Sequence, residues 1–187
     1  MENKEKFSAL FKAWVKRPGA AELLAWLETT DFFEAPASTK HHGVYPGGLV
    51  EHSLNVCREL VSSSAAERAT TESMILCALL HDVCKANYYA DVGMDGNGET
   101  IYQVIDQFPF GHGEKSVYLI SRFMRLTDEE ALAIRWHMGP YDDAAGSHAY
   151  KDARRYANQR YPLVIALHDA DMEATQKEKE AGYGRQH

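Results

Sequence analysis

The sequence predicts an all-α fold, a helical bundle with one small β-hairpin insertion, and two observations lead to this prediction. Apolar residues recur at helical spacing along most of the chain, between short stretches marked by Gly, Pro or Asn. Only residues 88–107 have instead a strand, turn and strand pattern. The length of 187 residues favours one domain with at most a small appendage. The composition, 45% hydrophobic and 25% charged, is that of an ordinary globular protein.

Two short helices and a loop are predicted before the main body of the bundle. The first helix, residues 3–16, carries its apolar side chains on one face and stops at Pro18-Gly19. That face consists of Phe7, Leu10, Phe11 and Trp14. The second helix, residues 20–28, is followed by an ordered loop over 30–47, because two prolines and two glycines there cannot continue a helix. We expect residues 1–34 to form an N-terminal helical appendage packed on the core.

The third and fourth helices carry the first polar residues that stand out from an apolar background. The third helix, residues 48–63, places His52 on an apolar stripe that faces the core. The stripe consists of Leu49, His52, Val56 and Leu60. The fourth helix, residues 71–86, is nearly apolar all round at its centre, which is typical of a buried central helix. His81 and Asp82 lie near the end of this helix.

The second half of the chain begins with the hairpin, for which Asp95-Gly96 is the turn signal. A fifth helix follows Gly111-His112-Gly113. A sixth helix begins at Thr127, because Glu130 three residues later completes a capping box. We expect the polar stretch 141–160 to contain one short helix.

The last helix opens at Pro162, since proline in the first turn of a helix costs little. One of its faces carries Val164, Leu167, Asp171 and Ala174. Asp171 is preferred over Asp169 as a functional residue, because Asp169 shares its face with Glu173. The final residues lack apolar side chains apart from Ala and Tyr, so we expect a flexible tail over 178–187 after a main domain over 35–177.

Charge and cysteine usage narrow the classes of partner and the compartment. A net charge of −7 argues against bulk binding to a nucleic-acid backbone. No apolar run is long enough for a signal peptide or a membrane span, so we expect a cytoplasmic protein without membrane attachment. The three cysteines, Cys57, Cys77 and Cys84, are expected to be buried thiols in a reducing compartment.

Four polar residues on or at the end of apolar helical faces predict a metal site. They are His52, His81, Asp82 and Asp171. Burying these groups without partners would cost several kcal/mol, and the same faces offer no lysine or arginine for a salt bridge. A divalent metal satisfies two imidazoles and two carboxylates together. A single histidine on such a face is usually a core residue bonded to a carbonyl, so the prediction depends on the joint pattern.

Five segments resemble the HD-domain superfamily of metal-dependent phosphohydrolases. They are HHGVYPGGLVEHSLNV, ALLHDVCK, GHGEKS, AIRWHMG and LHDADMEA, which follow the order H…HD…H…H…D over about residues 35–175. The sequence is most similar to small bacterial stand-alone HD proteins and to the HD part of a 3′ to 5′ exoribonuclease family. The resemblance implies the helical HD-domain fold, whereas the substrate depends on the site rather than on the fold.

The resemblance also implies a set of ligands for one or two divalent metal ions, which can be Fe, Mn, Zn or Mg. The first ion would be held by His52, His81, Asp82 and Asp171. Asp82 would bridge to a second ion held by His112 and His137, for which a helix cap or a core imidazole is the alternative role. Two positions depart from the family: Cys84 replaces a common glycine, and Met138 replaces a histidine found in some relatives.

Three further residues are candidates for contact with a phosphorylated substrate. Lys85 matches the lysine that commonly follows the HD pair, so it is predicted as a catalytic and substrate-binding residue beside Asp82. Lys115 in GHGEKS and His42 before the Gly47-Gly48 turn are predicted to bind substrate. The alternatives are a solvated lysine for Lys85 and hydrogen-bonded loop structure for His42 and its neighbour His41. His168 is expected in the core or behind a ligand.

The predicted function is hydrolysis of a phosphate ester, with Asp82 as the central ligand. The substrate class implied by the resemblance is a small phosphorylated molecule, such as a nucleotide. Two alternatives stay open. The same ligand order is similar to mixed-valent diiron oxygenases on this fold, because imidazole and carboxylate suit iron as well as zinc or manganese. A non-catalytic HD module that senses a nucleotide is the other alternative, and the oligomeric state is not predicted.

Overall fold

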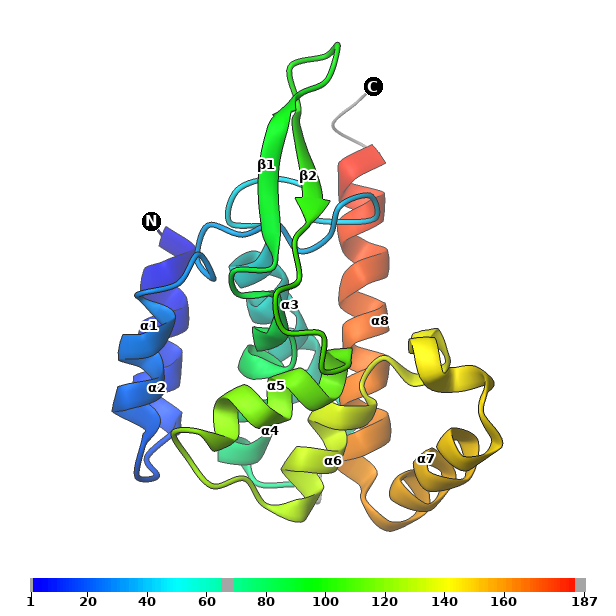
Figure 1. Ribbon diagram of the computed structural model, residues 1–187. Helices are drawn as coiled ribbons and strands as arrows, with labels where there is room; N and C mark the ends of the chain where they lie inside the picture. The colour runs from blue at the N-terminus through cyan, green and yellow to red at the C-terminus, as the bar shows by residue number, and fades with distance from the viewer. Residues whose placement is uncertain (1, 65–68, 184–187) are drawn as a thin grey trace.

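The computed structural model describes residues 2–64 and 69–183. Within these ranges the chain forms eight α-helices, three short 3₁₀ helices and one antiparallel pair of strands. In chain order they are α1 Glu2–Trp14, α2 Ala20–Leu27, α3 Gly48–Ser62, α4 Thr71–Leu80, η2 Val83–Lys85, β1 Tyr89–Met94, β2 Thr100–Val104, α5 His112–Ser121, α6 Asp128–Trp136, η3 Gly139–Tyr141, η4 Asp143–Gly146, α7 His148–Arg160 and α8 Pro162–Tyr183. The all-α prediction with one β-hairpin is confirmed (Figure 1). None of the helices in the described ranges is both long and apolar enough to cross a membrane.

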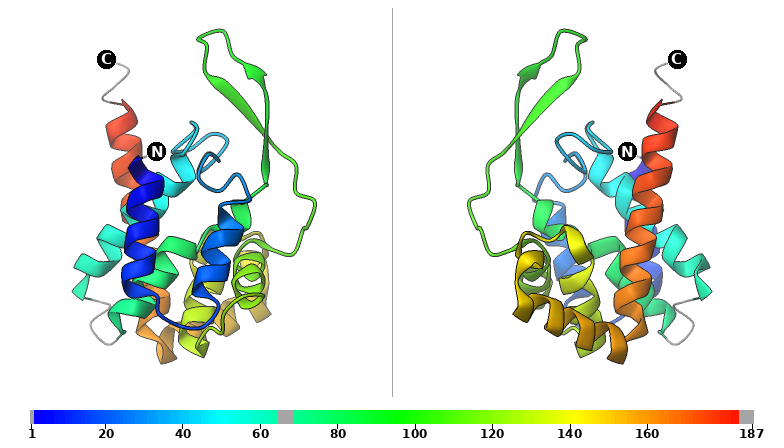
Figure 2. Two further views of the ribbon diagram at one scale, coloured as in Figure 1. Left: turned by 90° about the vertical axis from the view of Figure 1, so that its left-hand side faces the viewer. Right: turned by 90° about the vertical axis from the view of Figure 1, so that its right-hand side faces the viewer.

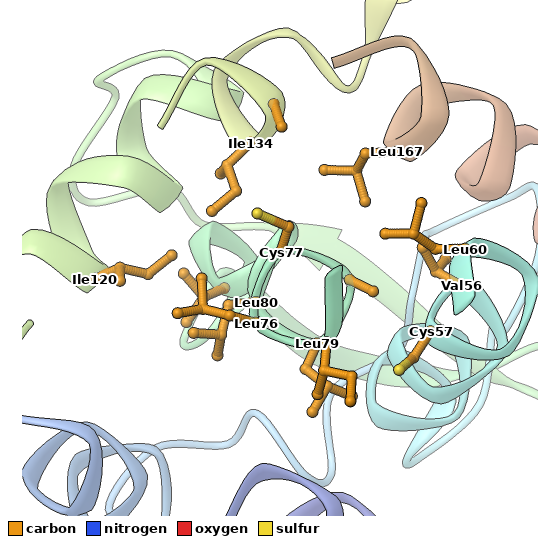
Figure 3. Close-up of a cluster of buried hydrophobic side chains, with 14 of the residues drawn as sticks. Val56, Cys57, Leu60, Leu76, Cys77, Leu79, Leu80, Ile120, Ile134 and Leu167 are labelled. Atoms are coloured by element: carbon orange, nitrogen blue, oxygen red, sulfur yellow. The ribbon is translucent and has the colours of Figure 1, made fainter. Parts of the chain in front are cut away.

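Helix α4 is the centre of the bundle, as its apolar sequence predicted. It contacts α1, α3, α6 and α8, and every residue from Ile75 to Leu80 is buried. Figure 3 shows side chains of α4 surrounded by those of α3, α5, α6 and α8. Because other helices cover α4 on all sides over these residues, none of its faces contacts solvent there. This explains why its sequence is apolar all round.

The N-terminal helices complete this core. Phe7 and Phe11 of α1 belong to the same hydrophobic cluster as the centre of α4, and so do Leu23 and Leu27 of α2. The segment between α1 and α2 adds a buried ion pair, in which Arg17 donates to both carboxylate oxygens of the fully buried Glu130 at 2.7 and 2.8 Å. Residues 2–27 are therefore held to the bundle by apolar packing and by charge.

Several helix ends follow the capping rules that the sequence signalled. The predicted capping box of α6 is confirmed: Thr127 Oγ1 accepts from the backbone of Glu130 at 3.2 Å, and the Glu130 carboxylate accepts from the backbone of Thr127 at 2.8 Å. Pro162 is the first residue of α8, as predicted. At the start of α3, a side chain at Gly48 would collide with the carbonyl of Gly43, so only glycine fits there.

The hairpin projects from the helical body, as Figures 1 and 2 show. Tyr89 pairs with Val104 and Met94 pairs with Thr100, so the connection runs over residues 95–99. Asp95 begins this connection as predicted, and its Oδ1 accepts from the backbone of Asn97 at 2.8 Å and of Glu99 at 2.9 Å. The turn is thus longer than the two-residue turn that Asp-Gly signals.

Three helix boundaries differ from the sequence-based expectation. Helix α4 ends at Leu80 rather than at residue 86, because Asp82 leaves the helical region at φ −104° and ψ 18°. The short helix expected within 141–160 is α7, with 13 residues. Helix α8 continues through Tyr183, so the expected flexible tail from residue 178 does not hold for residues 178–183, while residues 184–187 lie outside the described part.

Candidate metal centre

The first half of the site joins α3, the end of α4 and α8. His52, His81 and Asp171 are at most 5% exposed, and each offers one ligand atom within 4.8 Å of the others. His52 Nε2 lies 3.0 Å from Asp171 Oδ1, and the rings of His52 and His81 are 5.3 Å apart. The packing of α3 and α8 against α4 therefore brings together residues that are up to 119 positions apart in the chain.

The second half of the site surrounds Asp82, directly after α4. His112 Nε2 at the start of α5 lies 2.7 Å from Asp82 Oδ1, and His137 Nε2 after α6 lies 3.5 Å from the same oxygen. His81 Nε2 lies 3.4 Å from Asp82 Oδ2. His81 thus belongs to both halves, because it lies in one group with His52 and Asp171 and in another with Asp82 and His137. The bridging role of Asp82 stays a prediction. All six residues predicted as metal ligands gather at one site.

The orientation of two imidazole rings is fixed by the helices that carry them. His81 Nδ1 donates to the carbonyl of Ala78 at 2.8 Å, and His137 Nδ1 donates to the carbonyl of Ile134 at 2.6 Å. Because a carbonyl only accepts, the proton of each neutral ring resides on Nδ1. Both Nε2 atoms are buried and have no hydrogen-bond partner. Two free imidazole lone pairs beside a buried carboxylate are the donor set of a divalent metal site, so the residues fit such an ion.

Charges around Asp82 favour its ionised form. Burial alone raises the pKa of a carboxyl group, but Lys85 and the neighbouring histidines hold the pKa of Asp82 well below its ordinary value. Lys85 Nζ donates to Asp82 Oδ2 at 2.6 Å and to the carbonyl of Ala37 at 2.7 Å. Lys85 was predicted beside Asp82, but its salt bridge with Asp82 contradicts the expectation that these faces offer no lysine for such a pair. Burial lowers the pKa of His137, which keeps its ring neutral.

Glu178 is a member of the site that the sequence analysis missed. Both of its carboxylate oxygens lie 3.1 Å from His52 Nδ1, and Oε1 accepts from Asn55 Nδ2 at 2.7 Å. The ring of His52 is held between Glu178 and Asp171. Burial disfavours the charged ring, but hydrogen bonds to these two acids raise the pKa of His52 to about 10.

The predicted substrate residues lie at different distances from this centre. The ring of His42 is 4.6 Å from that of His52, and both its nitrogens are buried without a hydrogen-bond partner. Lys85 contacts Asp82 directly. Lys115 instead pairs with Asp106 at 2.6 Å and lies over the ring of Tyr88, and its contact with substrate stays a prediction.

A cleft of about 890 Å³ opens beside the first half of the site, and His41, His42 and Glu178 are among the residues that line it. His41 is exposed in this cleft, whereas His42 lies between the cleft and His52. His168 stands behind a ligand, because its Nδ1 donates to the carbonyl of His137 at 2.6 Å. The cleft therefore gives solvent a route to the neighbourhood of His52.

Comparison with protein families identifies the class. The model of the HD domain matches residues 49–175, so this chain belongs to the HD-domain family. The match includes every residue predicted as a metal ligand, from His52 to Asp171. No curated protein matches the chain, and no solved structure does. HD domains bind divalent metals, and the family consists largely of metal-dependent phosphohydrolases and other hydrolases. The predicted similarity to an exoribonuclease family stays a prediction.

Proposed function

We propose that this protein is a metal-dependent phosphohydrolase that acts on a phosphate ester of a small molecule, with a nucleotide or a related compound as the substrate class. One observation carries the proposal. The Nε2 atoms of His81 and His137 are buried, have no hydrogen-bond partner, and lie within 3.5 Å of the two oxygens of Asp82. A metal ion is the partner that satisfies two imidazole lone pairs and a carboxylate together.

The residues would hold the metal in two overlapping sets. His52, His81, Asp82 and Asp171 would hold one ion, and Asp82 with His112 and His137 would hold a second. A bound divalent metal lowers the pKa of a water ligand to near neutrality and neutralises charge on a phosphoryl oxygen. The chain contributes rigid orientation, because backbone carbonyls fix the rings of His81 and His137 before any ligand binds.

Positive charge near the site supports an anionic substrate. The chain as a whole carries a net charge of −7, so binding an anion requires local compensation. Lys85 supplies one cation beside Asp82. The cleft next to His42 is lined by four more cationic residues, namely Lys40, Arg58, Lys177 and Lys179, and by three acidic ones, Glu51, Glu99 and Glu178. We infer that the phosphoryl group binds beside the pair formed by Asp82 and Lys85 and that the rest of the substrate occupies the cleft.

The test is elemental analysis of protein purified without chelator, followed by assays of phosphatase and phosphodiesterase activity with Mn²⁺, Fe²⁺, Mg²⁺ and Zn²⁺. Asp82→Asn keeps the shape of the side chain and should abolish both bound metal and turnover. Asp169→Asn is the matched control, because Asp169 is exposed on the same helix as Asp171 and should leave both unchanged. Full hydrolysis by Asp82→Asn, or wild-type protein without metal and without activity, would overturn the proposal.

The same assays separate the two alternatives. Hydrolysis under anaerobic conditions excludes a reaction that consumes dioxygen, whereas oxygen uptake with an iron-loaded protein would favour the diiron oxygenase. Tight nucleotide binding with no turnover for any of the four metals would favour a nucleotide-sensing module.

A further inference from the structure

The cysteines of the chain lie in two different environments. Cys57 and Cys77 lie among the hydrophobic side chains of the core, as Figure 3 shows. Cys84 is just as inaccessible, at 3% exposed, but it faces polar groups. Its Sγ is 3.5 Å from Nδ1 and 3.8 Å from Nε2 of His112. Packing of a small apolar side chain does not explain this position.

Cys84, Asp82 and His112 form a cluster of three potential metal ligands. Each offers one ligand atom within 4.8 Å of the other two. The ring of His112 is held differently from the rings of His81 and His137, because its hydrogen-bond contacts run to Asp82 and Cys84 instead of to a helix carbonyl. Both groups that contact the His112 ring can therefore bind metals.

A further buried group points into the same place. His137 Nε2 is completely buried and unpartnered, and it lies 3.5 Å from the oxygen of Asp82 that His112 also contacts. The next residue is Met138, whose thioether is a weak ligand beside an imidazole or a thiolate. Around Asp82 Oδ1 the chain thus gathers one carboxylate, two imidazoles and one thiol.

We propose that Cys84 is a ligand of the metal ion held by Asp82 and His112, and that its thiolate selects zinc or iron over magnesium and manganese. The thiol proton is released to solvent when the ion binds, because the thiolate is the form that coordinates metals. Carboxylate, imidazole and thiolate donors together suit zinc or iron, whereas magnesium and manganese prefer oxygen ligands. The inference rests on the metal centre of the proposed function, not on the hydrolysis that it is proposed to perform.

The rival explanation is a simple hydrogen bond from the Cys84 thiol to the His112 ring. That contact needs no metal, and Ser at position 84 would preserve it with a stronger donor. Ligation by sulfur, in contrast, produces a spectroscopic signature that serine cannot reproduce. Co²⁺ bound to a thiolate has an intense sulfur-to-metal charge-transfer absorption in the near ultraviolet, and Co²⁺ with only oxygen and nitrogen ligands lacks it.

The experiment loads metal-free protein with Co²⁺ in anaerobic buffer and records the absorption spectrum. We expect the charge-transfer band in the wild type and in Cys57→Ser, and its loss in Cys84→Ser and Cys84→Ala. Chelator competition should show Zn²⁺ affinity lowered by more than about tenfold in Cys84→Ser, since losing even an outer partner of a metal ligand costs about 10–100-fold. Mn²⁺ affinity should change by less than about threefold, because manganese favours oxygen ligands.

Two results would overturn the inference: a wild-type protein that binds Co²⁺ without the band, or a band that persists in Cys84→Ser. Circular dichroism of both Cys84 variants establishes that they are folded, and two different replacements guard against a specific effect of serine. A band that depends on Cys84 in a protein without hydrolytic activity would uphold the thiolate ligand and refute the phosphohydrolase. Hydrolysis by a protein without the band would do the reverse.

Discussion

Replacing Glu178 by glutamine should weaken metal binding although Glu178 lies outside the set of residues expected to hold the ion. Its carboxylate accepts from His52 Nδ1 at 3.1 Å, which leaves Nε2 to face Asp171 and His81. A carboxylate behind a metal-bound histidine fixes the ring and makes its free nitrogen a stronger donor. Glutamine retains an oxygen acceptor for Nδ1 but removes the negative charge.

The contacts of Glu178 set the size of the effect. The side chain is 12% exposed, and both oxygens lie at the same distance from His52 Nδ1, with Asn55 holding Oε1 at 2.7 Å. Loss of such a partner costs about 10–100-fold in metal affinity. Because glutamine keeps the hydrogen bond, we expect about tenfold for Glu178→Gln, or about 1.4 kcal/mol, and about 100-fold for Glu178→Ala.

The assay is competition between the protein and a chelator for Zn²⁺ or Mn²⁺ at one fixed pH. All variants must be compared at the same pH, because the affinity for metal depends on pH. The pKa of His52 is about 10, so at neutral pH metal binding displaces a proton from the ring. Glu180→Gln is the matched control, since Glu180 is exposed on the same helix and, among the residues that the structure describes, bonds only to Gln176. Binding by Glu178→Gln that equals or exceeds that of Glu180→Gln would refute the reasoning.

Three further predictions concern stability. Arg17→Ala should lower the free energy of unfolding, measured in urea, by about 3 kcal/mol. This is the low end for a broken buried ion pair, because Glu130 keeps two other hydrogen-bond donors. As a control, Arg155→Ala removes an exposed ion pair and should cost under about 1 kcal/mol. Burial raises the pKa of Glu130, but Arg17 keeps this pKa below its ordinary 4.5. The ion pair therefore contributes its full stabilisation above pH 4.5. The difference in unfolding free energy between Arg17→Ala and the wild type should shrink as the pH falls below that value. Leu76→Ala, at a fully buried position of α4, should cost about 2–5 kcal/mol, and a loss below about 1 kcal/mol would contradict the central place of that helix.

The parts of the fold that depend on local periodicity could be predicted from the sequence. The apolar centre of α4 predicted a helix that is buried on all sides, and the Thr127 capping box predicted the start of α6. The end of α4 could not be predicted in this way. It depends on His81, whose ring donates to the carbonyl of Ala78, and on Asp82, which turns out of the helix toward His112. The contact between Asp82 and His112 exists only once α5 is packed in place.

The same distinction explains why Glu178 was missed. The apolar face of the last helix continues at helical spacing from Ala174 to residue 178, so the face itself indicated that Glu178 points inward. The charged residues around it, on the other faces, make the segment look like a solvated end. Asp171 and Glu178 are two helical turns apart, about 10.5 Å along the axis, too far to share one atom of a partner. Only the packing of α3 against α8 places the His52 ring between them, with one nitrogen for each acid. In this chain the two inward acids of α8, seven residues apart, thus form one side of the site, and α3 supplies the histidine between them.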